Sequence, residues 1–382
     1  MKSSKIQFVE ERGQKVKLNN LCSRGKSSLR QKDVSNDGPY AVYGASGLVG
    51  TMASFQNAVP YVAVVKDGAG VGRASACEAK TSVLGTMQAL IPSEGIDRDY
   101  LLHLVRSLHL GDGFSGSTIP HIYFKDYGKL PVRLHSPAEQ KRIVDIFASI
   151  ERQIKVSKQQ LDQLDSLVKS RFIEMFGDPV EENRWARITL ASLCTKLGSG
   201  ATPRGGKAAY KTSGIPLIRS MNVHNGYFES KDLAYIDEIQ AKKLDNVTLH
   251  KGDVLLNITG ASVARSCLLP DYLAGGRVNQ HVSIVRCDPN RMLPRVLNSI
   301  FTSDSYQRFL LEHSRMAGAT REAITKDDLE TMTVPLPPLS LQYKFAAFVA
   351  QVDKSRFGGM LHLLNSLSGI MHASFFSVAD TD

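Results

Sequence analysis

Two short stretches of this chain carry glycine and basic residues in an arrangement that could bind a phosphate group. Residues 20–27 (NLCSRGKS) lack the opening glycine of a P-loop, and residues 201–208 (ATPRGGKA) depart from that pattern at both ends. Residues 68–73 (GAGVGR) place three glycines on alternate positions, whereas a dinucleotide-binding loop needs a G-x-G-x-x-G run that opens a helix. We therefore expect the chain to bind no phosphate-containing cofactor.

Other residue types that do chemistry are present without the spacing that their chemistry requires. The ten histidines form no H-E-x-x-H or comparable metal motif, and no G-x-S-x-G nucleophile elbow occurs. Residues 178–180 (DPV) and 288–290 (DPN) both fall short of the D-P-P-[FY] loop that an amino-methyltransferase would use on a flipped base. The sequence predicts no catalytic residue, metal site or cofactor site, and the alternative is an enzyme with a diverged active site.

The cysteines and the apolar content indicate a cytoplasmic protein. The five cysteines, none of them in a C-x-x-C pair, are Cys22, Cys77, Cys194, Cys267 and Cys287. An odd, scattered set favours reduced thiols in a cytosol over a disulfide framework or a zinc site. No apolar run approaches the ~18 residues of a membrane span, and the sequence starts without an apolar signal segment.

The net charge of +10 is confined to two segments of the chain. Residues 1–135 hold 17 Lys and Arg against 11 Asp and Glu, and residues 181–337 hold 20 against 16. Residues 136–180 and 338–382 are each neutral. Because a requirement for solubility alone would not partition the charge in this way, two basic units suggest binding to a polyanion such as DNA.

An apolar repeat predicts one long helix from residue 136 to about residue 178. Ser136 and Pro137 supply an N-cap hydroxyl and a proline at the first helical position, and Gly177 and Pro179 end the helix. Apolar residues then recur every three or four positions, with a polar gap at Ser157, which is typical of a coiled-coil seam. The expected seam residues are Phe147, Ile150, Ile154, Leu161, Leu164 and Val168.

A helix of this length with one apolar stripe needs a partner helix, and residues 338–382 repeat the pattern. The seam residues expected there are Phe345, Val349, Val352, Met360, Leu364, Leu367 and Met371. We expect the two helices to form an antiparallel coiled coil. Gly358 and Gly359 coincide with a one-residue shift of phase, and each glycine costs about 1 kcal/mol relative to alanine in a helix interior. Whether the second helix is kinked is left open.

The segments that precede the two helices resemble each other, which indicates an internal duplication. The matching pairs are KVKLNNLC (15–22) with RITLASLC (187–194), GAGVGR (68–73) with GASVAR (260–265), GSTIPHI (116–122) with GATREAI (318–324), and VRLHSPAEQ (132–140) with VPLPPLSLQ (334–342). The last two pairs share one offset of 202 residues, which chance matches would not keep.

The predicted fold class is α+β with a pseudo-two-fold internal repeat. Short β-rich runs mix with one or two helices in each module, as in compact α/β domains. We expect two such domains, residues 1–135 and 181–337. The long helices of residues 136–180 and 338–382 would separate them as an antiparallel coiled coil.

The chain resembles the specificity (S) subunit of type I restriction–modification systems over essentially its whole length. The resemblance is carried by TIPHIYFKD (118–126), by the helix start SPAEQKRI (136–143) and by the helix end FIEMFGDP (172–179). The second half keeps the helix start PLPPLSLQ (335–342), whereas its closing FFSVAD (375–380) is a weak copy of the helix end.

The resemblance implies that each domain is a target recognition domain that reads one half of a bipartite site in double-stranded DNA. The paired helices would fix the spacing of the half-sites and dock two modification (methyltransferase) subunits. Those partners would use S-adenosylmethionine, and restriction (R) motor–nuclease subunits would complete the complex. The chain itself would be non-catalytic and without a cofactor. The alternatives are the specificity subunit of a type IIB-like combined nuclease–methylase and a purely structural coiled-coil scaffold.

Reading bases needs forked or amide side chains on exposed loops, with lysine and arginine nearby for phosphate. The candidates in the first domain are Lys66, Arg73, Gln88, Ser117, Thr118, His121 and Lys125. Those in the second are Arg219, Asn222, His224, Arg265, Asn279, Gln280, His281, Thr320 and Arg321. Arg73 and Arg265 hold equivalent positions, so a shared phosphate contact or structural role is the alternative to base reading there.

Overall fold

The structure is a computed structural model that describes residues 14–113, 120–203, 205–316, 322–355 and 358–377. It forms two compact units: unit 1 comprises Met1–Gln159 with Gly358–Asp382, and unit 2 comprises Gln160–Phe357. Within the described ranges, no helix is both long enough and apolar enough to cross a membrane.

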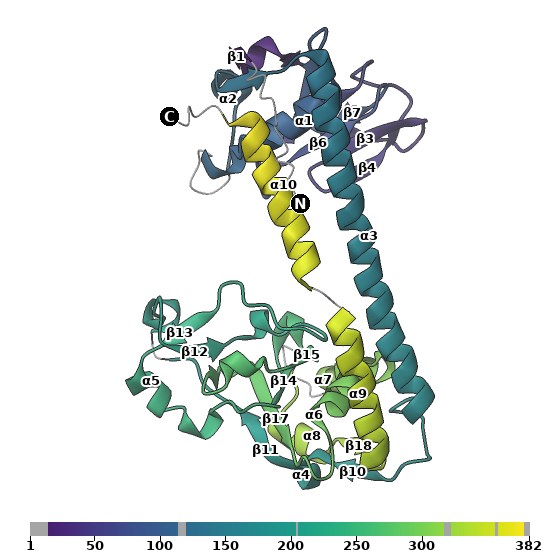
Figure 1. The fold of residues 1–382 in the computed structure, drawn as a ribbon, viewed down its shortest axis with the longest axis vertical. Coiled ribbons are helices and arrows are strands. Elements are labelled where there is room, and N and C mark those ends of the chain that lie inside the picture. Colours follow the sequence, from purple (N-terminus) through teal and green to yellow (C-terminus); the bar gives the residue numbers. More distant parts are fainter. Residues whose placement is uncertain (1–13, 114–119, 204, 317–321, 356–357, 378–382) are drawn as a thin grey trace, which may run out of the picture. The chain divides into compact units, whose positions relative to one another are not determined.

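Unit 1 contains two small sheets and one strand pair (Figure 1). Its strands are β1 Gln14–Lys17, β2 Cys22–Arg24, β3 Tyr40–Gly44, β4 Gly47–Met52, β5 Tyr61–Val65, β6 Ala74–Cys77, β7 Ser82–Val83, β8 Met87–Pro92 and β9 Pro131–Leu134. The strand orders are β2-β8-β5-β6, β4-β3-β7 and β1-β9. All neighbours are antiparallel except β3 and β7.

A helix packed on the four-stranded sheet forms the core of unit 1. The helices of this unit are α1 Arg98–Ser107, α2 Phe124–Tyr127, the first part of α3 Pro137–Phe176, and α10 Gly358–Phe376. The carboxylate of Asp97 caps α1 by accepting from the backbone N–H groups of Asp99 and Tyr100. Every residue of β5 is buried, as a central strand requires, and the apolar face of α1 covers it.

Unit 2 repeats the strands of this architecture and contains additional helices. Its strands are β10 Arg187–Thr189, β11 Cys194–Ser199, β12 Ile215–Ile218, β13 Ala234–Ile236, β14 Val254–Asn257, β15 Ser266–Leu268, β16 Arg277–Val278, β17 Val282–Cys287 and β18 Thr333–Pro335. Its helices are the end of α3 with α4 Leu190–Leu193, α5 Glu238–Lys242, α6 Pro294–Thr302, α7 Asp304–Met316, α8 Lys326–Thr331 and α9 Leu339–Ser355.

The strand orders of the two units correspond one to one. In unit 2 they are β11-β17-β14-β15, β13-β12-β16 and β10-β18. A parallel strand pair again lies in the three-stranded sheet, between β12 and β16. Equal order and equal direction in both units confirm the internal duplication and the α+β fold class that the sequence predicts.

The long helix predicted from residue 136 is present as α3, which spans 40 residues. Of its expected seam, Phe147 and Ile150 are buried, whereas Ile154, Leu161, Leu164 and Val168 are half-buried. The contacts of the chain divide α3 between Gln159 and Gln160, so each unit includes part of this helix. The division differs from the four consecutive segments expected, in which the helices are separate from the domains.

The second helix is described as two helices, because α9 ends at Ser355 and α10 begins at Gly358. Phe345, Val349 and Val352 are buried in the seam as expected, and Met371 is half-buried. Leu367 is 42% exposed and is not a buried seam residue, because the face of α10 that packs in unit 1 runs instead through Met371, His372, Phe375 and Phe376. The side chains of Met360 and Leu364 lie outside the part that the structure describes.

Each unit is completed where the start of one long helix meets the end of another. In unit 1, the ring of Phe147 on α3 lies 4.3 Å from that of His372 and 6.2 Å from that of Phe376, both near the end of α10. In unit 2, the rings of Phe172 and Phe176 at the end of α3 lie 5.6 and 5.5 Å from Phe345 near the start of α9. The helix pairs are therefore antiparallel within each unit, as predicted.

A buried glutamine anchors the start of α3 and of α9 to its own sheet domain. Gln140 accepts a hydrogen bond from the backbone N–H of Asp97 at 2.9 Å and donates to the carbonyls of Gly95 and His135. The equivalent residue, Gln342, accepts from the N–H of Leu293 at 2.8 Å. It donates to the carbonyls of Arg291 and Pro337. Both side chains therefore satisfy three buried or half-buried backbone groups each.

Two histidines of unit 1 lie around Phe147, of which His103 is buried and His372 is half-buried. The His103 ring of α1 stacks on Phe147 at 4.1 Å, and the His372 ring of α10 contacts the same phenyl group. Among the described residues, neither His103 Nδ1 nor His372 Nε2 has a hydrogen-bond partner. Burial lowers the pKa of His103 to about 3 and lowers the pKa of His372, and the nearby Arg106 lowers both pKa values further.

Replacing Gln342 by alanine will destabilise unit 2 by about 3 kcal/mol, because three backbone groups lose their partner at roughly 1–3 kcal/mol for each buried group. Urea unfolding followed by circular dichroism measures the change. The control Gln160→Ala, at an exposed position of α3, should shift the free energy of unfolding by less than ~0.5 kcal/mol. Equal losses for the two variants would show that the Gln342 bonds contribute nothing specific.

The histidine pair predicts that unit 1 loses stability in acid. The folded chain favours the neutral form of both rings, so their contribution to the free energy of unfolding is complete above a pKa of ~6.5, the value for the unfolded chain. As the pH falls below this value, the contribution is lost by up to ~1.4 kcal/mol per pH unit for each ring that stays neutral. The charged groups that face the pair are Arg106, Asp99 and Glu151, with His109 nearby.

The measurement is the melting temperature at pH 7.5 and at pH 5.5. We expect His372→Phe to reduce the difference between the two melting temperatures, because a phenyl ring binds no proton when the chain unfolds in acid. The control His224→Phe, at a half-exposed position in unit 2, should leave the difference unchanged. A difference that His372→Phe does not reduce would contradict the assignment.

Candidate nucleic-acid interface

A loop with the same backbone follows the central strand of each unit. This strand-end loop comprises residues 66–73 after β5 and residues 258–265 after β14. In unit 1 the N–H of Val65 donates to the Arg73 carbonyl and the N–H of Gly72 to the Val65 carbonyl. In unit 2 the N–H of Asn257 donates to the Arg265 carbonyl at 2.8 Å, and the N–H of Ala264 donates to the Asn257 carbonyl at 2.9 Å. Arg73 and Arg265 are therefore structurally equivalent, as the sequence predicts.

A second segment is bonded to the strand-end loop in both units. Gly68 donates to the Pro120 carbonyl, and Ile122 donates to the Lys66 carbonyl at 2.9 Å. In unit 2 the N–H of Gly260 bonds the Glu322 carbonyl, and that of Ile324 bonds the Ile258 carbonyl. The two glycines have φ of +85° and +78°, a backbone conformation that glycine adopts without strain. Sequence motifs offset by 202 residues thus reach the same place in each unit.

The polar side chains of this region in unit 1 centre on His121. Its Nδ1 lies 2.9 Å from the carboxylate of Asp67 in the strand-end loop. The exposed ring of Tyr123 stacks with the imidazole, and the ammonium group of Lys125 lies 5.4 Å from the centre of the Tyr123 ring. A cation, an aromatic ring and a histidine paired with an acid therefore form one polar surface, and Lys66 contributes a half-buried side chain from the loop.

Arg73 and Arg265 differ in what their side chains bind. The exposed guanidinium of Arg73 donates to the carbonyls of Ala45, Ala69 and Gly70, which ties it to its own loop. Arg265 is half-buried, and its guanidinium makes no hydrogen bond or ion pair with the residues that the structure describes. Arg265 is thus available to a phosphate, whereas Arg73 must first give up carbonyl partners.

An open groove of about 710 Å³ lies beside the strand-end loop of unit 2. Thr259, Ser262 and Arg265 line it from the loop, and Gln280 and His281 line it from the turn between β16 and β17. The hydroxyl oxygen of Thr259 lies 2.5 Å from His281 Nδ1, and Gln280 Nε2 lies 3.0 Å from His281 Nε2. Polar groups from two segments therefore meet in one groove, as base or phosphate contacts require.

Three of the predicted DNA-contacting residues are buried and serve the fold instead, so their assignment is wrong. Gln88 donates to the Ala89 and Gly25 carbonyls, and Asn222 bonds Arg219, Glu229 and Lys231 through backbone groups. Asn279 accepts from the N–H of His281. All three are under 5% exposed, because an amide that satisfies buried backbone groups cannot also face a ligand.

Two further predicted residues are half-buried beside aromatic rings. The Arg219 guanidinium lies 5.3 Å from the centre of the Tyr210 ring and donates to the Asp232 carbonyl. His224 stacks on Tyr227 with ring centres 4.8 Å apart. Neither belongs to the groove, so a structural role accounts for both. The predicted Ser117, Thr118, Thr320 and Arg321 lie outside the described residues.

Sequence reasoning missed Asp67, Tyr123, Thr202 and Thr259. Asp67 and Thr259 occupy equivalent positions, and each pairs with a histidine from another segment. Both are polar residues directly before a glycine that follows a buried strand, and this pattern could have singled them out. Thr202 donates to Gln280 Oε1 from the segment after β11, a contact across 78 residues that no local pattern encodes.

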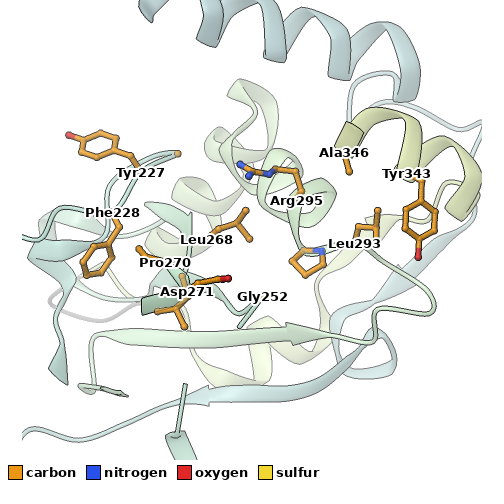
Figure 2. Close-up of a pocket in the computed structure, with 13 residues that line it drawn as sticks. Tyr227, Phe228, Gly252, Leu268, Pro270, Asp271, Leu293, Arg295, Tyr343 and Ala346 are labelled. Carbon is orange, nitrogen blue, oxygen red and sulfur yellow. The ribbon is translucent and has the colours of Figure 1, made fainter. Parts of the chain in front are cut away.

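Unit 2 also has a hollow of about 690 Å³ whose lining is shown in Figure 2. Its two charged lining residues are both paired, Arg295 with Asp353 at 3.0 Å and Asp271 with Lys251 at 3.4 Å. Tyr227 and Tyr343 stand at its rim in the view and are more than half exposed. The hollow therefore offers aromatic and aliphatic surface, which suits a macromolecular contact better than catalysis.

The cysteine thiols are unsuited to nucleophilic chemistry. All five are free, and all except the half-buried Cys194 are buried. Burial raises the pKa of Cys22, Cys194, Cys267 and Cys287 to about 12 and also raises that of Cys77. Since the thiolate is the reactive form, these side chains act as small apolar core residues.

Comparisons with known proteins agree with this architecture. Residues 10–166 match a family model described as the type I restriction modification DNA specificity domain. A type I restriction enzyme specificity subunit of Salmonella potsdam (StySPI) is 21% identical over 69% of this chain and 60% of its own length. That of Escherichia coli K12 (EcoKI) is 24% identical over 44% of this chain and 37% of its own. This chain therefore spans less than two thirds of the length of these relatives.

Two solved structures share the fold. The S subunit of a type I restriction–modification system from M. genitalium matches with a TM-score of 0.56 and 13% identity, over 98% of this chain and 99% of its own. A structure from work on complex assembly and conformational transition of the type I R-M system matches with a TM-score of 0.51 and 14% identity, over 96% and 98%. The first half of this chain therefore matches the type I restriction modification DNA specificity domain, and the chain shares its fold with these two solved structures.

Proposed function

We propose that this chain is the non-catalytic, sequence-specific DNA-binding subunit of a type I restriction–modification complex. Each unit reads one half of a bipartite site in double-stranded DNA. The observation that carries the proposal is the strand-end loop, which has one backbone in both units but different side chains. Asp67 in the loop of unit 1 pairs with His121 from the second segment, whereas the equivalent Thr259 in unit 2 pairs with His281 from the turn before β17. The same loop backbone with a different set of side chains in each unit implies that the two half-sites differ.

The charge distribution supports DNA as the ligand. The excess of Lys and Arg lies in residues 1–135 and 181–337, which carry the strand-end loops, and the long helices are neutral. Phosphate contacts from basic side chains position a protein on DNA, and polar contacts to base edges then provide the sequence preference. The surfaces around His121 and in the groove of unit 2 contain both kinds of group.

We further propose that α3 fixes the spacing between the half-sites, because it is one uninterrupted helix with part of its length in each unit. A helix of 40 residues is about 60 Å long at ~1.5 Å per residue. A stiff connection of that kind restricts the separation of two bound sites far more than a flexible linker would.

The long helices also carry the proposed docking surfaces for partner proteins. Apolar side chains that are more than 40% exposed are Val156, Leu167 and Ile173 on α3 and Leu367 and Ile370 on α10. Exposed apolar residues in such number on helices suit protein contacts. We propose that two modification subunits, which supply S-adenosylmethionine-dependent adenine methylation, dock there and that restriction subunits join them. We propose a cytoplasmic location for the complex, because it would act there on host DNA with these partners.

Selection from random duplex DNA tests the function. The full chain is used in complex with the modification subunit of its host. We expect two short, different half-sites separated by a fixed number of base pairs, because two units with different side chains are held on one helix. Enrichment of a single contiguous motif would show that only one unit reads sequence. Absence of any enriched motif would overturn the proposal.

Arg265→Ala is expected to weaken binding to the selected site and to reduce the slope of log affinity against log salt by about 1, as the loss of one phosphate contact does. Fluorescence anisotropy at several salt concentrations measures both quantities. The control Lys326→Ala removes a cation of unit 2 that is already paired with Glu330 at 3.2 Å. A wild-type slope for Arg265→Ala would remove this residue from the interface.

A further inference from the structure

Gln280 is the exposed amide at the groove of unit 2, and its orientation is set by its neighbours. The hydroxyl of Thr202 donates to Gln280 Oε1, and Gln280 Nε2 donates to His281 Nε2 at 3.0 Å. His281 Nε2 is then an acceptor, so its Nδ1 carries the proton and donates to the Thr259 hydroxyl oxygen at 2.5 Å. The four side chains form one chain of hydrogen bonds that runs in a single direction.

This chain of hydrogen bonds ties together three separate segments of unit 2. Thr202 follows β11, Gln280 and His281 form the turn before β17, and Thr259 lies in the strand-end loop after β14. The turn itself is fixed, because buried Asn279 accepts from the N–H of His281 and its carbonyl accepts from Gly200. The amide of Gln280 is therefore preorganised before any ligand arrives.

The two orienting bonds leave part of the amide unused. A glutamine side chain has two N–H donors and a carbonyl oxygen with two lone pairs. With the described residues, Gln280 uses one donor to His281 and one lone pair to Thr202. One donor and one acceptor remain, on a side chain that is exposed at the rim of the groove.

A donor and an acceptor on one amide match the major-groove edge of adenine. The amide oxygen accepts from adenine N6, and the amide N–H donates to adenine N7. We propose that Gln280 is a specificity-determining residue that reads an adenine in the half-site bound by unit 2. This assignment rests on the proposed DNA-binding function. Thr202, His281 and Thr259 are positioning residues, because they act on the base through Gln280.

The test is the base preference of Gln280→Glu, measured by selection from random duplex DNA beside the wild type, with the same full chain and modification subunit. The substitution preserves shape but replaces the N–H donor by an acceptor, and a carboxylate accepts from cytosine N4. We expect one adenine in one half-site to lose at least about tenfold in preference and cytosine to gain there. The other half-site and the spacing should not change.

Two further variants distinguish the base contact of Gln280 from the orienting role of its neighbours. Thr259→Val removes a hydroxyl that orients His281, so it should relax discrimination at that same position without shifting it to cytosine. Gln160→Glu makes the same chemical change on the exposed surface of α3 and should leave every base preference as in the wild type.

The outcomes distinguish this inference from the function on which it rests. If the wild type selects two half-sites and Gln280→Glu selects the same bases, the inference is overturned and the function stands. A change confined to a position that is not adenine also overturns it. If the wild type selects no sequence, both the function and the inference fail.

Discussion

The structure depends on antiparallel contacts between the start of one long helix and the end of another. Phe147 meets His372 and Phe376 in unit 1, and Phe345 meets Phe172 and Phe176 in unit 2. Neither half of the duplicated sequence completes a core by itself, because α3 starts in one unit and ends in the other. Gln140 and Gln342 then attach the start of each helix to its sheet domain through buried backbone groups. Folding of the helices and of the two units is consequently coupled.

The backbone of the strand-end loop, which is the same in both units, and the side chains around it, which differ, have different roles. Backbone hydrogen bonds around Val65 and Asn257 build the same strand-end loop in both units, and they need no particular side chain. The side chains of the loop are then free to differ, as Asp67 and Thr259 do, which pair with His121 and His281 from other segments. Proteins that keep the backbone of this loop and differ in its side chains can bind different DNA sequences with the same fold. In the proposed function, the loop backbone determines where the protein contacts a base, and the side chains determine which base they bind.

Patterns in the sequence predicted the elements that depend on local chemistry. The helix start at Pro137, the repeat with its offset of 202 residues and the buried strands β5 and β14 all follow from periodicity and capping. The site was predicted less well, because burial of an amide depends on contacts far along the chain. Gln88 has the residue type of a base reader, but its amide donates to the carbonyl of Gly25, 63 residues away in the sequence. Leu367 lies outside the buried face of α10, which runs through Met371, Phe375 and Phe376, because the extrapolated repeat did not give the phase of this helix.

The most direct test of the account is the dependence of DNA affinity on the distance between the two half-sites. Dissociation constants are measured for the full chain with its modification subunit on duplexes that differ only by insertion or deletion of one or two base pairs. Each added pair moves one half-site by ~3.4 Å and rotates it by roughly 34°. If α3 holds the units at one separation, affinity will peak at a single spacing and fall at least ~tenfold on either side. Equal affinity at all spacings would contradict the account.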